Sequence, residues 1–149
     1  MLVDFQFKES YNIDDLLEVM KILRSPEGCP WDKEQTHKSI RQDFIEEVYE
    51  AVEAIDLDDR ELLREELGDV LLQVVFHCRI EEEKNNFAFD DICDELCKKL
   101  IVRHPHVFGQ VTVSGTGEVL RNWDSIKKET KGQETYADTL ESVAKSLPA

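Results

Sequence analysis

The stretch EEVYEAVEAIDLDDRELLREELGDVLLQVVFH, residues 46–77, contains the two most regular helical patterns of the chain. Apolar residues recur at steps of three and four on both sides of an acidic turn at residues 56–59, which is the spacing of one face of an α-helix. The pattern predicts one helix that begins near Thr36 or Ser39 and ends at this turn, and another over residues 60–83. We expect two buried apolar stripes, formed by Ile45, Val48, Val52 and Ile55 in the first helix and by Leu63, Leu67, Val70, Leu71, Val74 and Cys78 in the second.

The segment before these helices predicts a further helix. Asn12 is a good helix N-cap and Asp15 occupies the third helical position, so we expect a helix that ends at about Arg24. The proline- and glycine-containing residues 25–32 should form a loop.

Helical spacing also continues after the two acidic helices. We expect a helix from residue 90 or 91 to about His104, because Pro105 disfavours helical geometry at the residue before it, and a last helix over residues 118–131. Residues 111–113 could form a short extended piece, for which the sequence offers no partner strand. The sequence therefore predicts an all-α fold, an antiparallel helical bundle.

Length and composition predict a single soluble domain. The chain has 149 residues, of which 41% are hydrophobic and 34% charged. We expect an N-terminal extension over residues 1–11, a helical domain over 12–131, and a polar tail over 132–149 that links to a missing C-terminal region. The sequence has no run of ~20 apolar residues and no signal peptide, so we expect a cytoplasmic protein without membrane contacts.

The charge balance limits the possible partners. With 33 acidic and 18 basic residues, the formal net charge is -15, and no block of basic residues could neutralise a row of phosphates. Nucleic acid is therefore an unexpected partner. A small anionic substrate fits only if a cation bridges it to the protein.

The acidic residues of the two central helices suggest where such a cation could bind. Glu47 and Glu50 are three residues apart, as are Glu66 and Asp69, so each pair forms a ledge on its own helix. If the helices are antiparallel neighbours, the ledges can face one cleft, where two carboxylates 4 Å apart repel by about 4 kcal/mol at an effective dielectric of 20. Such a site must take up protons or a hard cation such as Mg²⁺, Mn²⁺ or Ca²⁺. Spacing alone is equally consistent with an acidic face that is simply exposed to solvent.

Four stretches in the right order resemble the MazG family of all-α nucleoside triphosphate pyrophosphohydrolases. They are LRSPEGCPWDKEQTHKSI (23–40), EEVYEAVEAI (46–55), EELGDVLLQVVFH (65–77) and KKLIVRHPHVFG (98–109). The resemblance implies hydrolysis of a nucleoside triphosphate to the monophosphate and pyrophosphate, with Mg²⁺ as cofactor and Mn²⁺ as a possible substitute. It also implies the removal of non-standard or excess nucleotides as the role of the protein.

The resemblance also implies roles for individual residues. The implied metal ligands are Glu47, Glu50, Glu66 and Asp69, and the implied catalytic residues are Glu46 and Glu47, with Glu46 placed near the attacking water, a further metal or a water of the outer shell. The implied substrate contacts are Lys99 and Arg103 to phosphates and Trp31 to the base.

The resemblance further implies a homodimer or higher homo-oligomer and a chain cut from a longer one. Two alternatives remain open for the function. One is a narrower pyrophosphohydrolase that acts on phosphoribosyl-ATP or dUTP, and the other is a non-catalytic regulatory or interaction module of a multidomain protein.

Overall fold

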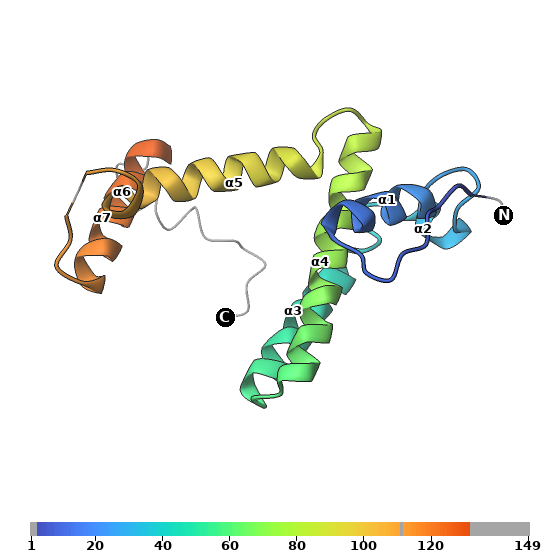
Figure 1. Ribbon diagram of the computed structural model, residues 1–149, viewed down its shortest axis with the longest axis horizontal. Coiled ribbons are helices and arrows are strands. Elements are labelled where there is room, and N and C mark those ends of the chain that lie inside the picture. The colour runs from blue at the N-terminus through green and yellow to red at the C-terminus, as the bar shows by residue number, and fades with distance from the viewer. Residues whose placement is uncertain (1–2, 111, 132–149) are drawn as a thin grey trace. The chain divides into compact units, whose positions relative to one another are not determined.

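The computed structural model describes residues 3–110 and 112–131, which fold into α-helices joined by short loops (Figure 1). The helices are α1 (Ile13–Leu23), α2 (Pro30–Glu34), α3 (Arg41–Asp56), α4 (Arg60–Glu83), α5 (Phe89–Arg103), α6 (Pro105–Phe108) and α7 (Thr116–Lys131). No β-strand occurs in these described ranges, so the all-α prediction is confirmed. Thr112 and Val113 are not in a strand, and Val111, the remaining residue of the expected extended piece, lies outside the described residues.

The helices fall into two compact units, the first ending at Asp91 and the second beginning at Ile92. The first unit contains α1 to α4, and the second contains most of α5 together with α6 and α7. The boundaries of the expected helical domain, residues 12–131, remain a prediction. The expected polar tail lies outside the described residues.

The start of α1 follows the predicted capping pattern. The Asn12 side chain accepts a hydrogen bond from the Asp15 backbone N–H (3.2 Å), and the Asp15 carboxylate accepts one from the Asn12 N–H (2.8 Å). This reciprocal pair satisfies two of the N–H groups that a helix start leaves unpaired. Hydrogen bonds from Lys8 and from the Asn12 backbone hold the pKa of Asp15 below its usual value.

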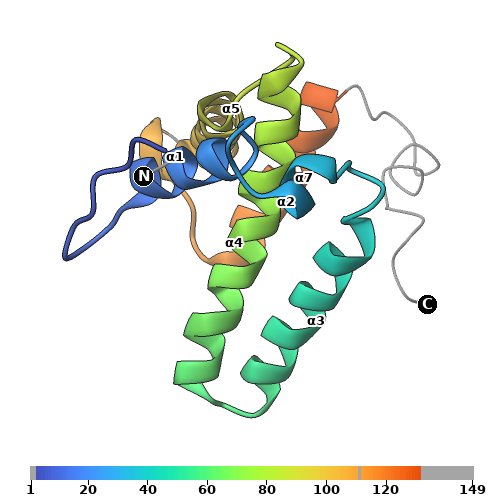
Figure 2. The same ribbon diagram turned by 90° about the vertical axis from the view of Figure 1, so that its right-hand side faces the viewer.

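The α3–α4 hairpin is the main contact of the first unit, and Figures 1 and 2 show its two helices side by side and antiparallel. Only residues 57–59 connect them. Asp58 adopts a left-handed conformation (φ 52°), which reverses the chain within this short turn. Asp59 then caps α4 by accepting a hydrogen bond from the Leu62 N–H (3.0 Å).

Two short stretches depart from the sequence expectation before α3. Residues 25–32 were expected to be a loop, but α2 begins at Pro30, whose fixed φ suits the first helical position. The second predicted helix begins at Arg41, later than Thr36 or Ser39. Thr36 and Ser39 instead exchange hydrogen bonds between their hydroxyls and backbone N–H groups (2.8 and 3.2 Å), and this local turn delays the helix.

The buried core of the first unit lies where α1 crosses α4. Met20, Ile40, Val75, Phe76 and Ile80 are each at most 4% exposed and pack against one another. The α1–α4 contact places the strongest hydrophobic burial at the C-terminal half of α4.

Arg24 ties three elements together at the edge of this core. Its Nε donates to the Glu83 carboxylate (2.8 Å), and its Nη1 donates to the backbone carbonyls of Asp32 (2.5 Å) and Gln35 (3.1 Å). Its guanidinium also lies 5.4 Å from the centre of the Phe76 ring. Arg24 thereby links the end of α1 to the end of α2 and to the end of α4.

A second polar chain fixes the residues before α3 to α4. The His37 Nε2 and Glu81 Oε1 atoms are 2.5 Å apart, and the Nδ1 atoms of His37 and His77 are 2.6 Å apart. Hydrogen bonds from Asn86 and then from His37 lower the pKa of Glu81, so its carboxylate is an acceptor and His37 Nε2 carries the proton. One of the two facing Nδ1 atoms donates and the other accepts, and His77 Nε2 is buried without a hydrogen-bond partner.

The second unit also begins and ends its helices on local polar contacts. His104 Nδ1 bonds to the Leu100 carbonyl (2.6 Å) at the end of α5, and Pro105 starts the short α6, which the sequence analysis did not expect. The Glu118 carboxylate accepts hydrogen bonds from the Ser114 N–H (2.9 Å) and hydroxyl (2.8 Å). These contacts organise the chain just before α7, which begins at Thr116, two residues earlier than predicted. None of the helices in the described ranges has the length and apolar character needed to cross a bilayer.

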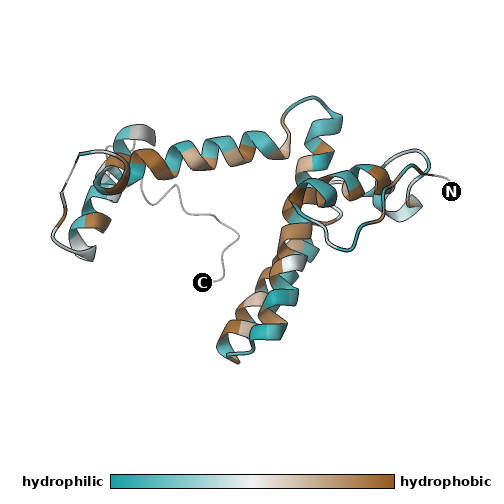
Figure 3. Ribbon diagram, viewed as in Figure 1, coloured by the Kyte–Doolittle hydropathy of each residue, from teal (hydrophilic) through white to brown (hydrophobic). Residues whose placement is uncertain are grey.

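The apolar stripes predicted for the two central helices are buried only in part. Val52 of α3 is 45% exposed and Leu67 of α4 is 54% exposed, whereas Cys78, at the end of the stripe predicted for α4, is buried. Along the hairpin, the buried positions are Ala51 and Ala54 on α3 and the polar Glu66 and Gln73 on α4, and the apolar burial of α4 lies further on, at its C-terminal half. Hydrophobic residues, coloured brown, recur along both helices down to the tip of the hairpin (Figure 3), and several of them are exposed, among them Ile55 and Leu57.

This exposed apolar surface predicts self-association. We expect the chain to sediment as a dimer or a larger homo-oligomer at micromolar concentration, because association would bury the stripes. Val52→Lys should raise the dissociation constant about tenfold or more, since burial of one such side chain contributes about 1.5 kcal/mol. Analytical ultracentrifugation checks both, with Glu53→Lys as the control on the same helix. A stable 17.3 kDa monomer would contradict the prediction.

Candidate metal centre

Three of the predicted metal ligands converge in the α3–α4 hairpin. Glu47 on α3 and Glu66 and Asp69 on α4 each offer a carboxylate oxygen, and these oxygens all lie within 4.8 Å of one another. The antiparallel pairing of α3 with α4 brings the Glu47 turn beside the turn that carries Glu66 and Asp69. The three acids therefore form one group, which we call the carboxylate group.

Burial and mutual repulsion raise the pKa of two members of this group, Glu47 and Glu66. Burial is the main cause that raises the pKa of Glu66 to about 7, followed by a hydrogen bond with Glu50 and by the negative charges around it. Burial also raises the pKa of Glu47, with added effects of Glu50 and Asp69. Two carboxyl groups can share a hydrogen bond only when one is protonated, so the metal-free site retains a proton near neutral pH.

The fourth predicted ligand, Glu50, lies at the edge of the carboxylate group. Its side chain is exposed on α3 and interacts with both Glu47 and Glu66 through hydrogen bonding and charge. Of the four predicted ligands, the structure thus places three together and the fourth beside them.

The oxygens of the group fit a hard divalent cation. Glu47 Oε2 and Glu66 Oε2 are buried and have no hydrogen-bond partner. Within the described ranges, no lysine, arginine or histidine forms an ion pair with Glu47, Glu66 or Asp69. Buried carboxylates without a protein cation require either protons or a metal, and an all-oxygen donor set favours Mg²⁺, Mn²⁺ or Ca²⁺. The group could therefore hold a divalent metal ion.

The structure adds two polar residues that the sequence analysis did not select. Asp43 precedes Glu47 by four residues, and its charge contributes to the raised pKa of Glu47. Gln73 follows Asp69 by four residues and is only 7% exposed, and its Oε1 has no hydrogen-bond partner. Both could have been found by extending each ledge by one helical turn.

The remaining predicted site residues are not among the three acids of the carboxylate group. Glu46 is exposed on α3. Trp31 is 57% exposed on α2, and its backbone carbonyl accepts a hydrogen bond from the Gln35 side chain (2.8 Å). Lys99 and Arg103 lie on α5 in the second unit, exposed and 8% exposed respectively. Their functional roles stay predictions.

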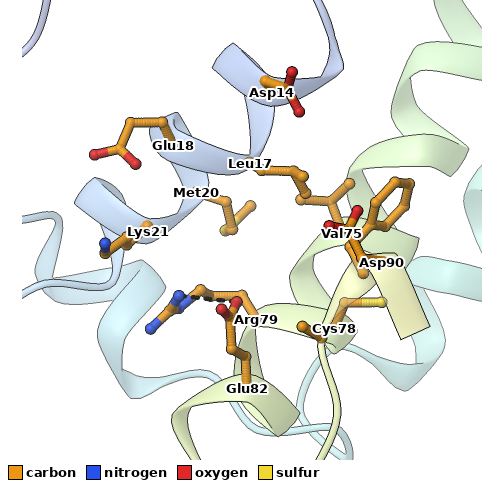
Figure 4. A pocket seen from close by; sticks show the side chains of 12 residues that line it. Asp14, Leu17, Glu18, Met20, Lys21, Val75, Cys78, Arg79, Glu82 and Asp90 are labelled. Carbon is orange, nitrogen blue, oxygen red and sulfur yellow. Dashed lines mark hydrogen bonds and ion pairs between the residues drawn. The ribbon is translucent and has the colours of Figure 1, made fainter. Parts of the chain in front are cut away.

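A pocket of about 220 Å³ lies apart from the carboxylate group, against α1 and the C-terminal half of α4 (Figure 4). Leu17, Met20 and Val75 supply apolar walls, and Arg79 Nη1 pairs with Glu82 Oε2 at 3.0 Å. None of the lining residues belongs to the carboxylate group. This pocket is therefore separate from the candidate metal centre.

Comparison with known proteins agrees with the carboxylate geometry. Residues 35–108 match the family described as the MazG nucleotide pyrophosphohydrolase domain. A Bacillus subtilis protein named YabN is 49% identical over 131 residues, which cover 88% of this chain and 27% of that protein. The nucleoside triphosphate pyrophosphohydrolase of Escherichia coli K12 is 46% identical over 138 residues, which cover 92% of this chain and 52% of the relative.

A solved structure shows the same fold. The mazG-related protein from Thermotoga maritima superimposes with a TM-score of 0.65 and 24% identity, over 78% of this chain and 99% of that protein. The chain spans from about a quarter to about half the length of the curated relatives it matches. By its matched segment, its relatives and its helical fold, the chain carries a MazG domain over residues 35–108.

Proposed function

We propose that this protein is a nucleoside triphosphate pyrophosphohydrolase that uses Mg²⁺ and releases the nucleoside monophosphate and pyrophosphate. The observation that carries the proposal is the convergence of Glu47, Glu66 and Asp69 in a MazG domain. Relatives at 39–49% identity, several of them named nucleoside triphosphate pyrophosphohydrolases, support the same activity. The activity would serve to remove non-standard or excess nucleotides from the pool.

In this proposal the carboxylate group holds the metal and Glu50 supports it from the edge. A bound Mg²⁺ would neutralise phosphate charge and lower the pKa of a coordinated water, which are the two main needs of phosphoanhydride hydrolysis. The carboxylates themselves exclude a bare triphosphate, since a protein with a net charge of -15 repels polyanions. Substrate would therefore bind as its magnesium complex.

Other side chains take supporting roles in the proposal. Glu46, next to Glu47 on α3, would accept a proton from a water at the edge of the site. Trp31, on the α2 segment that Arg24 fixes, would stack on the base. Lys99 and Arg103 would contact phosphates. Each role rests on a match to the family pattern and on accessibility or position along its helix.

Product analysis tests the reaction. With Mg²⁺ or Mn²⁺ and each common or damaged nucleoside triphosphate in turn, we expect the monophosphate and pyrophosphate in equal amounts. Ion-exchange chromatography with a coupled pyrophosphate assay separates these from diphosphate and orthophosphate. Turnover of dUTP or phosphoribosyl-ATP alone would indicate a pyrophosphohydrolase with a narrower substrate range. Orthophosphate as the first product would contradict the proposed reaction, and the absence of turnover would favour a non-catalytic module.

A single charge removal tests the metal site. Glu66→Gln keeps the side-chain shape but removes a ligand charge, so we expect Mg²⁺-dependent activity to fall by about 100-fold or more, given that even outer-shell changes at metal sites cost 10- to 100-fold. Added Mg²⁺ should raise the melting temperature of the parent and raise it less in the variant. Glu53→Gln, an exposed acid on α3, serves as the control. An unchanged Mg²⁺ response in Glu66→Gln would contradict the proposal that the carboxylate group binds the metal.

The raised pKa of Glu66 also predicts how stability depends on pH in the metal-free protein. An acid whose pKa rises from 4.5 to about 7 on folding binds more protons in the folded state between these values, so its contribution to stability declines as pH rises through this window. In EDTA, Glu66→Gln should therefore gain stability relative to the parent from pH 5 to pH 8. Chemical denaturation at several pH values measures the difference. Parallel curves for parent and variant would contradict the raised pKa.

A further inference from the structure

Gln73 is the buried polar side chain that the carboxylate geometry leaves unexplained. It is 7% exposed, and its amide oxygen Oε1 is buried without a hydrogen-bond partner. Burial of an amide oxygen without a donor is unfavourable by about 1–3 kcal/mol, so such a group usually indicates a ligand or water that completes it.

The position of Gln73 on α4 directs it to the carboxylate group. At ~100° per residue, Gln73 lies roughly 20° from Glu66 and roughly 40° from Asp69 around the helix axis. It is one turn beyond Asp69, about 6 Å along the axis. Helical side chains lean towards the N-terminus, which carries the Gln73 amide back towards Asp69 and the metal-binding oxygens.

Within the described ranges, no donor forms a hydrogen bond with Gln73 Oε1. The register that places Glu47 beside Asp69 puts Asp43, four residues earlier, against Gln73, four residues later, and a carboxylate only accepts. One turn further along α4, His77 Nε2 is itself buried without a hydrogen-bond partner, so it makes no hydrogen bond to Gln73 Oε1. A bound molecule can supply the donor that this oxygen lacks.

We infer that Gln73 is a positioning residue of the metal site, whose Oε1 accepts a hydrogen bond from a water bound to the metal held by Glu47, Glu66 and Asp69. The inference rests on the proposed function for the presence of the metal. Mg²⁺ keeps several waters when carboxylates bind it, and each of these waters is a strong donor. A distance of one helical turn suits a contact through a water better than direct coordination. Gln73 would thereby fix the orientation of one water and tighten metal binding.

Metal binding by itself tests this role, without reference to turnover. Gln73→Met replaces the amide with an apolar group of similar length, so we expect Mn²⁺ affinity to fall about 10- to 100-fold, as for other outer-shell contacts. The metal-free variant should be as stable as the parent or more stable, because the unpaired oxygen is gone. Gln73→Glu keeps an acceptor oxygen at the same place and should retain Mn²⁺ affinity within a few fold of the parent. Gln42→Met, an exposed glutamine on α3, is the matched control.

Titration of Mn²⁺ by calorimetry and by electron paramagnetic resonance, with thermal melts in EDTA, gives the outcomes. Weaker Mn²⁺ binding in Gln73→Met with restored binding in Gln73→Glu supports the role. The role of Gln73 is overturned if a folded Gln73→Met variant binds Mn²⁺ as tightly as the parent, or if reduced stability of the metal-free protein is its sole defect. In either case, pyrophosphate release by the parent would leave the proposed function standing. A parent that binds no Mn²⁺ overturns both. A parent that binds Mn²⁺ but hydrolyses no triphosphate overturns the proposed function alone, because the affinity comparison still decides the role of Gln73.

Discussion

The crowding of carboxylates between α3 and α4 is the constraint on which the rest of the hairpin depends. Glu47, Glu66 and Asp69 approach within 4.8 Å without a protein cation to neutralise them, and the pKa of Glu66 rises to about 7 as a result of burial and this crowding. Such an arrangement opposes folding of the metal-free chain, since like charges in a half-buried seam repel. Residues that stabilise the fold must therefore lie elsewhere, and a bound cation would turn the repulsion into attraction. The same chemistry would link the stability of the fold to the binding of a metal ion.

The location of the apolar surface follows from this polar seam. Because acids, Gln73 and small alanines occupy the faces on which α3 and α4 meet, the larger apolar residues such as Val52 and Leu67 must point elsewhere. Compensating burial occurs at the other end of α4, where α1 covers Val75, Phe76 and Ile80. The α3–α4 hairpin thus packs against its own chain at one end and leaves exposed apolar residues that a further partner could cover.

Sequence reasoning succeeds here where the determining interactions are local. The capping pair of Asn12 and Asp15 and the unbroken spacing over residues 60–83 specify α1 and α4 closely, and steps of three residues suffice to group Glu66 with Asp69. It fails where the outcome depends on how the helices pack against one another. Periodicity shows that α4 has an apolar stripe but not which face meets α3, so Leu67 was expected in the core and is exposed. The short helices α2 and α6 each begin at a proline and are too brief for any periodic signal. The raised pKa of Glu66 and the unpaired oxygen of Gln73 depend on burial, which spacing does not measure.

The polar contacts at the C-terminal end of α4 give the proposed substrate contact at Trp31 a fixed support. Trp31 belongs to a five-residue helix that is too short to be stable by its own hydrogen bonds. Arg24 binds the carbonyls of Asp32 and Gln35 on one side, and His37 binds His77 and Glu81 just beyond. Both anchors end on α4, the helix that carries Glu66 and Asp69. The segment that would hold a base and the seam that would hold the metal and phosphates are consequently attached to one rigid element, which limits the freedom a nucleotide must remove when it binds.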